Sequence, residues 1–389
     1  MVALSPVGRD PGFKSMSRQR LAISIAFLAF GAACGSWVPR LPAIKDQLKI
    51  TDGQVGLALL AFAAGAVAGA ALSRMILARG ARRFVRIGTL ALCAALIGPG
   101  FAKGLTALIA SLVVMGVCAG FLDVLENAQA AELERNTGRP LINGFHGFWS
   151  LGAIVGSVTA GAAAYAGVAP LPQFIAAGGL IAAGSAAFLR ELPDTRSGSI
   201  HATSLAGGRL RWTGSVTAVA AIALCGILVE GASDWSALYL RDLSQASDAV
   251  AAAGFACFWA AATLTRFRAD LLTAHTSPAA VARLGALVAT CGIALAVAFP
   301  ALPGPLIGFA LAGVGAAVLV PLAFSAAANL GQSGTALTLV TSTGYVGSIV
   351  GPALIGAIAD HAGLRFGICI PLLAAVIAVA LAGALRLPR

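Results

Sequence analysis

Charged residues are scarce in this chain, and that scarcity excludes an ordinary soluble domain. Only 11% of the 389 residues are charged, whereas 59% are hydrophobic and the mean hydropathy is +0.90. Soluble globular domains carry about 25% charged residues. The chain also lacks a GxxxxGK[ST] segment and has no polar region large enough for a nucleotide-binding domain. We therefore expect an ion gradient or the solute's own gradient, and not ATP, to supply any energy.

Cysteine and histidine are too few and too scattered to indicate a metal or redox site. The seven cysteines all lie in apolar stretches, none forms a CxxC pair, and none has a histidine at metal-ligand spacing. We interpret the cysteines as small packing residues. We expect no metal and no cofactor, and no motif supports an enzyme.

Twelve apolar segments make up most of the chain. Crossing about 30 Å of hydrocarbon takes about 20 residues of α-helix. The segments are continuously apolar and not alternating, which favours helices over a β-barrel. We predict an all-α membrane protein whose transmembrane helices cover residues 21–38, 55–78, 84–101, 105–125, 145–165, 171–189, 216–238, 250–264, 284–299, 306–328, 336–359 and 366–385.

The net charge of +11 does not indicate nucleic-acid binding, because the basic residues lie in short runs between apolar segments. With the N-terminus inside, the cytoplasmic segments carry 20 of the 26 Lys and Arg residues and the opposite side carries 6. Basic residues concentrate on the cytoplasmic side of membrane proteins. We predict a multi-pass protein of the inner (plasma) membrane with both termini cytoplasmic, and we expect a monomer in the lipid bilayer.

The apolar segments fall into two sets of six. We predict a cytoplasmic N-terminal tail at 1–20, a six-helix bundle at 21–189, a cytoplasmic linker at 190–214 and a second six-helix bundle at 215–389. The halves resemble each other weakly at an offset close to 197 residues, which aligns Arg86-Ile87-Gly88 with Arg283-Leu284-Gly285. Two bundles with this parallel symmetry flank a site near the middle of the membrane.

Small residues recur at a spacing that lets helices approach closely. The pairs Gly65 and Gly69, Gly152 and Gly156, and Gly347 and Gly351 are four residues apart, so each pair lies on one helix face. We expect these residues to serve helix packing and not chemistry.

Several short segments resemble a known family. They include Gly35-Ser36-Trp37-Val38-Pro39-Arg40-Leu41-Pro42, Leu122-Asp123-Val124 and Gly344-Tyr345-Val346-Gly347. On these residues the chain resembles the major facilitator superfamily over roughly residues 20–387. Within it, the chain is similar to a bacterial inner-membrane group often called YbjJ-like and, more distantly, to proton-coupled fucose permeases. The resemblance implies a secondary transporter with a proton-binding acid at Asp123.

The superfamily's signature loop, which joins the second and third helices, is only partly kept. Arg79-Gly80-Ala81-Arg82-Arg83 is present, but Ser73 or Arg74 stands where an acid is expected. The counterpart between the eighth and ninth helices retains Arg266 and Asp270. The resemblance implies that Arg79, Arg82, Arg83, Arg266 and Asp270 act in gating, with the second copy the more important.

Ionisable side chains inside apolar segments are candidates for function, because one costs about 2.5 to 3.5 kcal/mol at a helix centre. Asp123, Glu126 and Asn127 are three and four residues apart, so they share a helix face that we expect to line a cavity. Two close carboxylates can share, load and release a proton, and Asn127 can bind substrate. The alternative is a set of interfacial ion pairs with Glu132, Glu134, Arg135 and Arg139.

Two further acids, Glu230 and Asp234, are one turn apart in the seventh segment. Glu230 is nearer the middle of the membrane, where it can bind a cation or hydroxyl groups by charge-assisted hydrogen bonds. Asp234 is closer to the outer rim, and we expect it to pair with Arg241 or Arg40 and latch the two halves.

Histidine and aromatic residues complete the candidate site. His146 opens the fifth segment and titrates near neutral pH, so it can relay protons to Asp123, although a helix-capping role is an alternative. Trp37, Trp149, Trp259 and Tyr345 can stack on a substrate. For Trp37, and also for Trp235, a position at the membrane interface is an equally good explanation.

These observations lead to one hypothesis and two alternatives. The leading hypothesis is a proton-coupled carrier for a small polar solute, such as a sugar or a metabolite. It would work by alternating access through a cavity lined by helices 1, 4, 5, 7, 10 and 11. One alternative is an exporter of drugs or metabolites, since the acids also suit cationic compounds. The other is a non-transporting membrane sensor. The direction of transport stays open.

Overall fold

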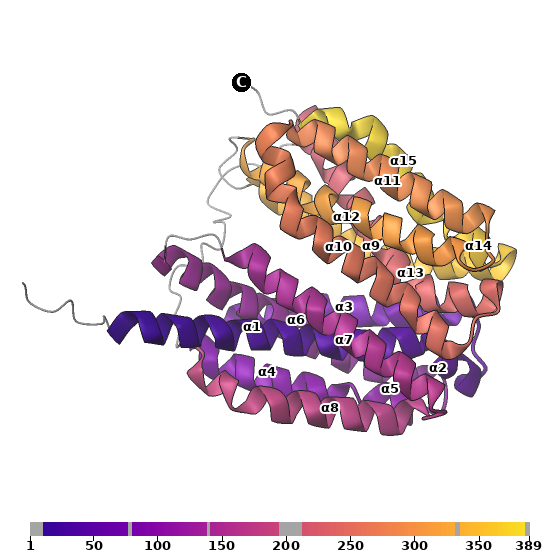
Figure 1. Cartoon of the computed structure of the whole chain (residues 1–389), viewed down its shortest axis with the longest axis horizontal. Helices are drawn as coiled ribbons and strands as arrows, with labels where there is room; N and C mark the ends of the chain where they lie inside the picture. The colour runs from indigo at the N-terminus through magenta and orange to yellow at the C-terminus, as the bar shows by residue number, and fades with distance from the viewer. Residues whose placement is uncertain (1–10, 77–79, 138–140, 194–211, 331–334, 386–389) are drawn as a thin grey trace, which may run out of the picture.

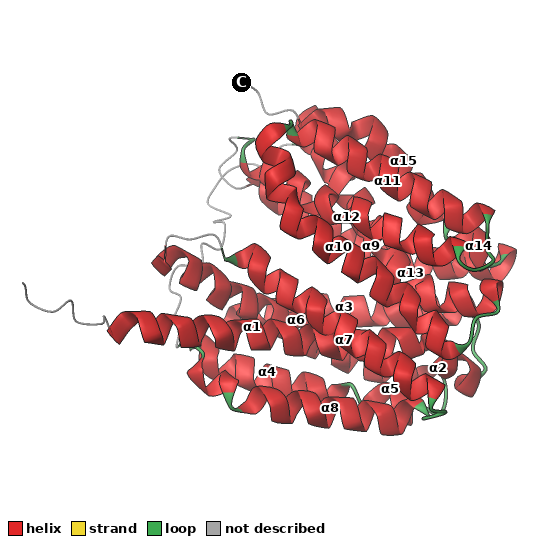
Figure 2. Ribbon diagram, in the orientation of Figure 1, coloured by secondary structure: helices red, strands yellow, loops and turns green. Residues whose placement is uncertain are grey.

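The computed structural model describes residues 11–76, 80–137, 141–193, 212–330 and 335–385, and within these ranges it contains helices and short loops but no strand (Figure 2). Hydrocarbon offers no hydrogen-bond partners, so the backbone N–H and C=O groups of each segment must pair within that segment. Long helices satisfy this requirement. The predicted all-α membrane fold is confirmed.

The helices follow the predicted segments closely. Those of the first half are α1 (Pro11–Trp37), η1 (Val38–Arg40), α2 (Leu41–Leu48), α3 (Asp52–Ile76), α4 (Ala81–Ala95), α5 (Gly98–Phe101), α6 (Leu105–Thr137), α7 (Ile142–Tyr165), α8 (Pro170–Ala186) and η3 (Phe188–Glu191). Those of the second half are α9 (Gly214–Ser244), α10 (Asp248–His275), α11 (Pro278–Ala298), α12 (Gly304–Ala328), α13 (Thr335–Ala362), α14 (Leu364–Gly367), α15 (Cys369–Leu381) and η4 (Ala382–Leu385).

The number of spans matches the prediction. Within the described ranges, 11 helices are long and apolar enough to cross a membrane. The remaining predicted segment corresponds to α8, an apolar helix of 17 residues that is extended by η3. Helices therefore account for all twelve apolar segments, with short breaks between α4 and α5, between α8 and η3, and between α14 and α15.

Two boundaries differ from the prediction. α1 begins at Pro11 and not at residue 21, so the second half of the predicted tail is helical. α10 continues to His275, which places Arg266 inside a helix and not in a loop. Polar helix ends can extend beyond the hydrocarbon into interfacial water, where hydropathy no longer marks them. Most of the predicted linker, residues 194–211, lies outside the described part of the chain.

Figure 1 shows the helices gathered into two groups, which we call the N-terminal bundle (α1–α8) and the C-terminal bundle (α9–α15). The bundles lie against each other near α2 and diverge toward the opposite end, where α1 begins and the C-terminus lies. Two helix pairs join the bundles: α3 packs on α13, and α7 packs on α10.

Glycine allows very close contact between helices of the N-terminal bundle. A Cβ atom added at Gly69 of α3 would lie 2.0 Å from the carbonyl oxygen of Val117 in α6. One added at Gly152 of α7 would lie 2.1 Å from the carbonyl oxygen of Leu28 in α1. The packing role predicted for the first two glycine pairs is therefore confirmed. Gly347 and Gly351 instead contact leucine side chains of α9.

Replacing one of these glycines tests the importance of the close contact. Gly69→Ala should lower the stability of the purified protein by about 1 to 3 kcal/mol, because the new methyl group overpacks the contact with α6. Thermal unfolding in detergent, followed by intrinsic fluorescence, measures this change. Gly179→Ala in α8 is the matched control, since nothing lies within 4 Å of its added Cβ. Equal melting temperatures for the two variants would contradict the expectation.

Candidate functional site

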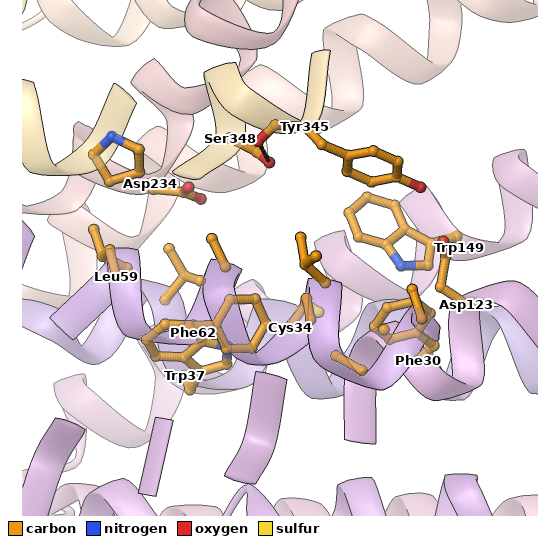
Figure 3. Close-up of a pocket in the computed structure, with 18 of the residues that line it drawn as sticks. Phe30, Cys34, Trp37, Leu59, Phe62, Asp123, Trp149, Asp234, Tyr345 and Ser348 are labelled. Carbon is orange, nitrogen blue, oxygen red and sulfur yellow. Dashed lines mark hydrogen bonds between the residues drawn. The ribbon is translucent and has the colours of Figure 1, made fainter. Parts of the chain in front are cut away.

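A cavity of about 310 Å³ lies between the two bundles (Figure 3). α1, α3, α6 and α7 line it on one side, and α9, α10 and α13 line it on the other. Five of the six helices predicted to line a cavity therefore do so. The exception is the tenth span, α12, whose place is taken by α3 and α10, the second and eighth spans. A smaller cavity of about 200 Å³ adjoins the first and shares Asp234, Trp259, Ser348 and Pro352 with it.

Aromatic rings form much of the cavity wall. Trp149 of the N-terminal bundle meets Trp259 of the C-terminal bundle edge to face, with 4.8 Å between ring centroids. Trp37 packs on Phe62 at 5.4 Å. Tyr345 is 45% exposed and lies near Trp149 at one end of the cavity (Figure 3). The four aromatic residues predicted as substrate contacts thus all line the cavity.

The alternative explanation for two tryptophans, a position at the membrane interface, does not fit the structure. Trp37 is only 2% exposed and lines the cavity, and Trp235 is fully buried. Trp235 does not line the cavity, and its ring lies against Gly356 of α13. Both side chains therefore belong to the protein interior.

Asp123 faces the cavity from α6 and belongs to a hydrogen-bonded chain. The Nδ2 group of Asn127 donates to the Asp123 carboxylate at 3.1 Å and to its backbone carbonyl at 2.9 Å. The Oδ1 atom of Asn127 lies 3.2 Å from Nε2 of His146, which must carry a proton to donate to it. Asp123 and His146 are thus connected only through the side-chain amide of Asn127. The predicted proton relay from His146 to Asp123 would have to pass through this amide.

Glu126 does not share the cavity with Asp123. It is fully buried, and neither of its carboxylate oxygens has a hydrogen-bond partner within the described ranges. Helix geometry explains the separation. At 100° per residue, Glu126 and Asn127 lie on opposite sides of Asp123 around the helix axis. The expectation that one face carries all three side chains into a cavity was therefore wrong for Glu126.

Glu230 is held by an arginine from the neighbouring helix. Nη2 of Arg266 lies 2.9 Å from Oε1 of Glu230, and the guanidinium group lies 5.5 Å from the centroid of the Trp259 ring. Glu230 therefore already has a cationic partner, which weakens its predicted role as a substrate ligand. Arg266, predicted to act in a gating loop, instead lies beside the smaller cavity that Glu230 lines.

The predicted latch between Asp234 and either Arg40 or Arg241 is absent from the described residues. Arg40 is buried and donates to the backbone carbonyls of Ala160 and Val168, at 3.4 and 2.7 Å. Arg241 pairs with Asp46 and Asp242. Asp234 instead lines both cavities. Arg241 lies about two helical turns beyond Asp234 in α9, so Asp234 lies at the depth of the cavities and not at the end of the helix.

Other charged residues join the bundles at the α2 end. Lys45 of α2 donates to Asp242 of α9 at 2.9 Å and to Asp52 of its own bundle at 2.6 Å. Nη2 of Arg241 donates to Asp46 at 3.0 Å, and its Nη1 is also bonded to that carboxylate. We call these five residues, Lys45, Asp46, Asp52, Arg241 and Asp242, the closing cluster.

A carboxylate from the C-terminal bundle caps a helix of the N-terminal bundle at the same end. Asp360 of α13 accepts a hydrogen bond from the backbone N–H of Gly53 at 2.7 Å and from the Thr51 hydroxyl at 2.8 Å. The first N–H groups of a helix lack partners inside that helix, and a negative charge there is favourable. Separating the bundles at this end would leave the first turn of α3 without this cap.

The predicted signature loop can be described only in part. Arg79 lies outside the described residues, and the structure does not describe the Asp270 side chain, although Asp270 itself lies within α10. Arg82 is half-buried and Arg83 is exposed at the start of α4. In the part of the chain that the structure describes, no three His, Cys, Asp or Glu residues are grouped to hold a metal ion.

Comparison with known proteins places the chain in a family. The family model of the Major Facilitator Superfamily matches residues 22–345. A transporter of Sinorhizobium fredii described as uncharacterized is 33% identical over 362 residues, covering 92% of this chain and 96% of that protein. Membrane protein MosC of Rhizobium meliloti is 32% identical over 368 residues, covering 93% of this chain and 88% of that protein. The chain therefore belongs to the major facilitator superfamily. The relative from Sinorhizobium fredii is named as a transporter.

Solved structures show the same fold. The nucleoside transporter NupG has a TM-score of 0.70 at 14% identity and covers 94% of this chain and 98% of its own. FucP in its outward conformation has a TM-score of 0.62 at 18% identity, covering 95% and 99%. An inward-facing bacterial homologue of the lysosomal transporter Spinster has a TM-score of 0.67 at 15% identity, covering 96% and 97%. At these identities the likeness concerns the fold alone.

The closing cluster provides a test of what holds the α2 end together. Lys45→Gln removes one of the two cations that bridge the bundles, the other being Arg241, so the distance between the bundles at this end should increase in part of the population. Nitroxide labels at Gln47 and His361, which are both exposed at this end, would report that distance by double electron–electron resonance in a cysteine-free background. Lys103→Gln removes the same charge from an exposed loop and should leave the distance unchanged. Identical distance distributions for the two variants would show that Lys45 is not needed to close this end.

Proposed function

We propose that the chain is a proton-coupled secondary transporter that carries a small solute through the inter-bundle cavity by alternating access. The bundles contact each other through polar residues at the α2 end and diverge at the other end. A rocking motion about α3–α13 and α7–α10 would exchange which end is open. The proposal includes an inner-membrane location with both termini cytoplasmic, so that the described conformation opens to the cytoplasm.

One observation carries the coupling to protons: Asp123 lines the cavity and is hydrogen-bonded to Asn127, which is bonded in turn to His146. A carboxylate in this position can bind a proton from the cavity water. Asn127 fixes its orientation, and His146 fixes Asn127, so both are positioning residues. Among the acids predicted for coupling, only Asp123 lines the cavity, and we assign the proton to it and not to Glu126.

The membrane topology can be tested independently of transport. Alkaline phosphatase fused after the last residue should be inactive in a bacterial host, because the enzyme needs the oxidising periplasm to form its disulfides. The same fusion inserted after Lys103, between the third and fourth spans, should be active, since this loop lies at the α2 end. The reverse pattern would place the termini outside and would overturn the proposed orientation.

Proton coupling can be tested in liposomes that contain the purified protein and a pH-sensitive dye. The vesicles are challenged in turn with sugars, polyols and organic amines. At least one solute class should cause proton movement in the wild-type protein, and Asp123→Asn should abolish this movement because the amide cannot take up the proton. Solute uptake without coupling, measured by counterflow, should remain.

Glu126→Gln is the matched control, since it removes a second carboxylate from the same helix that lies outside the cavity. It should retain most of the proton movement. If Asp123→Asn retained the movement and Glu126→Gln lost it, Glu126 would be the coupling residue. If no member of the panel moved protons or entered the vesicles, the proposal of a proton-coupled transporter would fail.

A further inference from the structure

We propose that the solute is an organic amine, bound as its ammonium ion, and that Asp234 is its counter-ion in the cavity. This inference rests on the proposed transport function, and it assigns a chemical class to the solute. It also gives Asp234 a different role from the predicted latch. Three separate observations support it: the charges that line the cavity, the hydrogen-bonding groups near Asp234, and the chemistry of the remaining wall residues.

The charges that line the cavity have one sign. Asp123 and Asp234 contribute carboxylates at its opposite ends, as Figure 3 shows, and no Lys, Arg or His lies among the described lining residues. Two cations of the neighbouring parts of α9 and α10 are engaged elsewhere: Arg266 pairs with Glu230, and Arg241 pairs with Asp46 and Asp242. A buried carboxylate is stable only with a partner, a proton or water. A cationic solute would supply the missing partner.

The hydroxyl and carbonyl groups of α13 near Asp234 can accept hydrogen bonds from a solute, whereas the indole N–H of Trp259, which also lines both cavities, is a donor without a partner among the described residues. The hydroxyl of Ser348 donates its hydrogen to the backbone carbonyl of Tyr345 at 2.9 Å, so only its lone pairs are left. Pro352 lies within α13 and has no N–H, which leaves the carbonyl of Ser348, four residues earlier, without its helical donor. Both residues line the two cavities together with Asp234. An ammonium group has three N–H donors and no acceptor, so it matches the acceptors of Ser348 and the Asp234 carboxylate.

The remaining walls favour an apolar body and a cation over a polyol. Asp123, Asp234, Ser348 and Tyr345 are the only hydroxyl or carboxyl groups on the described lining residues. A polyol would lose water from most of its hydroxyl groups without replacement, and each loss is unfavourable. Aromatic faces attract cations as well as apolar groups. Trp37, Phe62 and Trp149 supply aromatic rings to the cavity wall, whereas the Trp259 ring already has the Arg266 guanidinium over it.

The two carboxylates have different surroundings, which separates their roles. Asp123 receives a hydrogen bond from Asn127, whereas no described residue bonds to the Asp234 carboxylate. Asp234 is therefore free to pair with the solute while Asp123 holds the proton. The proton and the amine then occupy separate sites, one in each bundle.

Binding in detergent tests this inference without requiring transport. The probe is phenethylamine, an ammonium ion at pH 7.5, and its neutral analogue of matched size is 2-phenylethanol. Phenylacetate and myo-inositol represent anions and polyols. By isothermal titration calorimetry, phenethylamine should bind at least tenfold more tightly than any of the other three. Asp234→Asn should remove this preference by weakening amine binding at least tenfold, with the affinity for 2-phenylethanol unchanged.

Two further variants separate a direct role from a structural one. Glu191→Gln removes an exposed carboxylate that lines neither cavity and should keep the amine preference. Asp234→Glu should restore most of the preference if the carboxylate itself is the counter-ion. If the Asp234→Asn protein does not fold, Phe62→Leu provides a second test, because it removes an aromatic ring from the cavity wall. It should reduce amine binding severalfold more than alcohol binding.

The outcomes distinguish this inference from the proposed function. Equal binding of the amine and the alcohol, or a preference that survives Asp234→Asn, would overturn the amine assignment. Proton movement driven by myo-inositol in a protein that does not bind phenethylamine would leave the transport function standing and refute the amine assignment. Amine binding without movement of amine or protons into vesicles would support the assignment and contradict the proposed function.

Discussion

A carboxylate inside a membrane protein needs a partner, a proton or water, and this requirement organises the interior of the chain. Glu230 has Arg266, Asp123 has Asn127, and the acids at the α2 end have Lys45 and Arg241. Asp234 has the cavity. Glu126 has neither a bonded partner among the described residues nor the cavity, so by the same rule it holds a proton. Hydrocarbon imposes the same rule on the backbone, which is why long helices make up the fold. A solute or a proton can act at a carboxylate that has no partner within the protein.

Close glycine contacts occur both inside the N-terminal bundle and between the bundles, where Gly56 of α3 and Gly356 of α13 meet, but ion pairs are added at the junction. Inside the N-terminal bundle, glycines such as Gly69 and Gly152 bring backbones into direct contact, and such contacts allow little relative movement. At the α2 end the bundles are held by ion pairs and by the Asp360 cap, which water can replace. In the proposed rocking motion, each bundle would move as a unit and these exchangeable ion pairs would open.

The sequence predicted the helices better than it predicted the partners of their side chains. Hydropathy locates the spans because it sums over about 20 residues, and spacing along α6 correctly placed Asp123 beside Asn127. The same spacing did not reveal that Glu126 turns away from the cavity, because that depends on which helices surround α6. The contacts of Lys45 with Asp242, and of Asp360 with Gly53, join residues far apart in the chain. The only sequence signal for them is the occurrence of isolated charges at the ends of apolar segments.

The separation of Lys45 from Asp242 is 197 residues, the same offset that aligns Arg86 with Arg283. Residues at equivalent positions of two repeated halves meet where the halves join around their symmetry axis. Two identical halves would bring lysine against lysine there, and like charges repel. The closing cluster therefore depends on the halves having become different at this position. A protein assembled from two copies of one bundle would lack the attraction between Lys45 and Asp242 at its junction. The difference in sequence between the two halves provides this attraction.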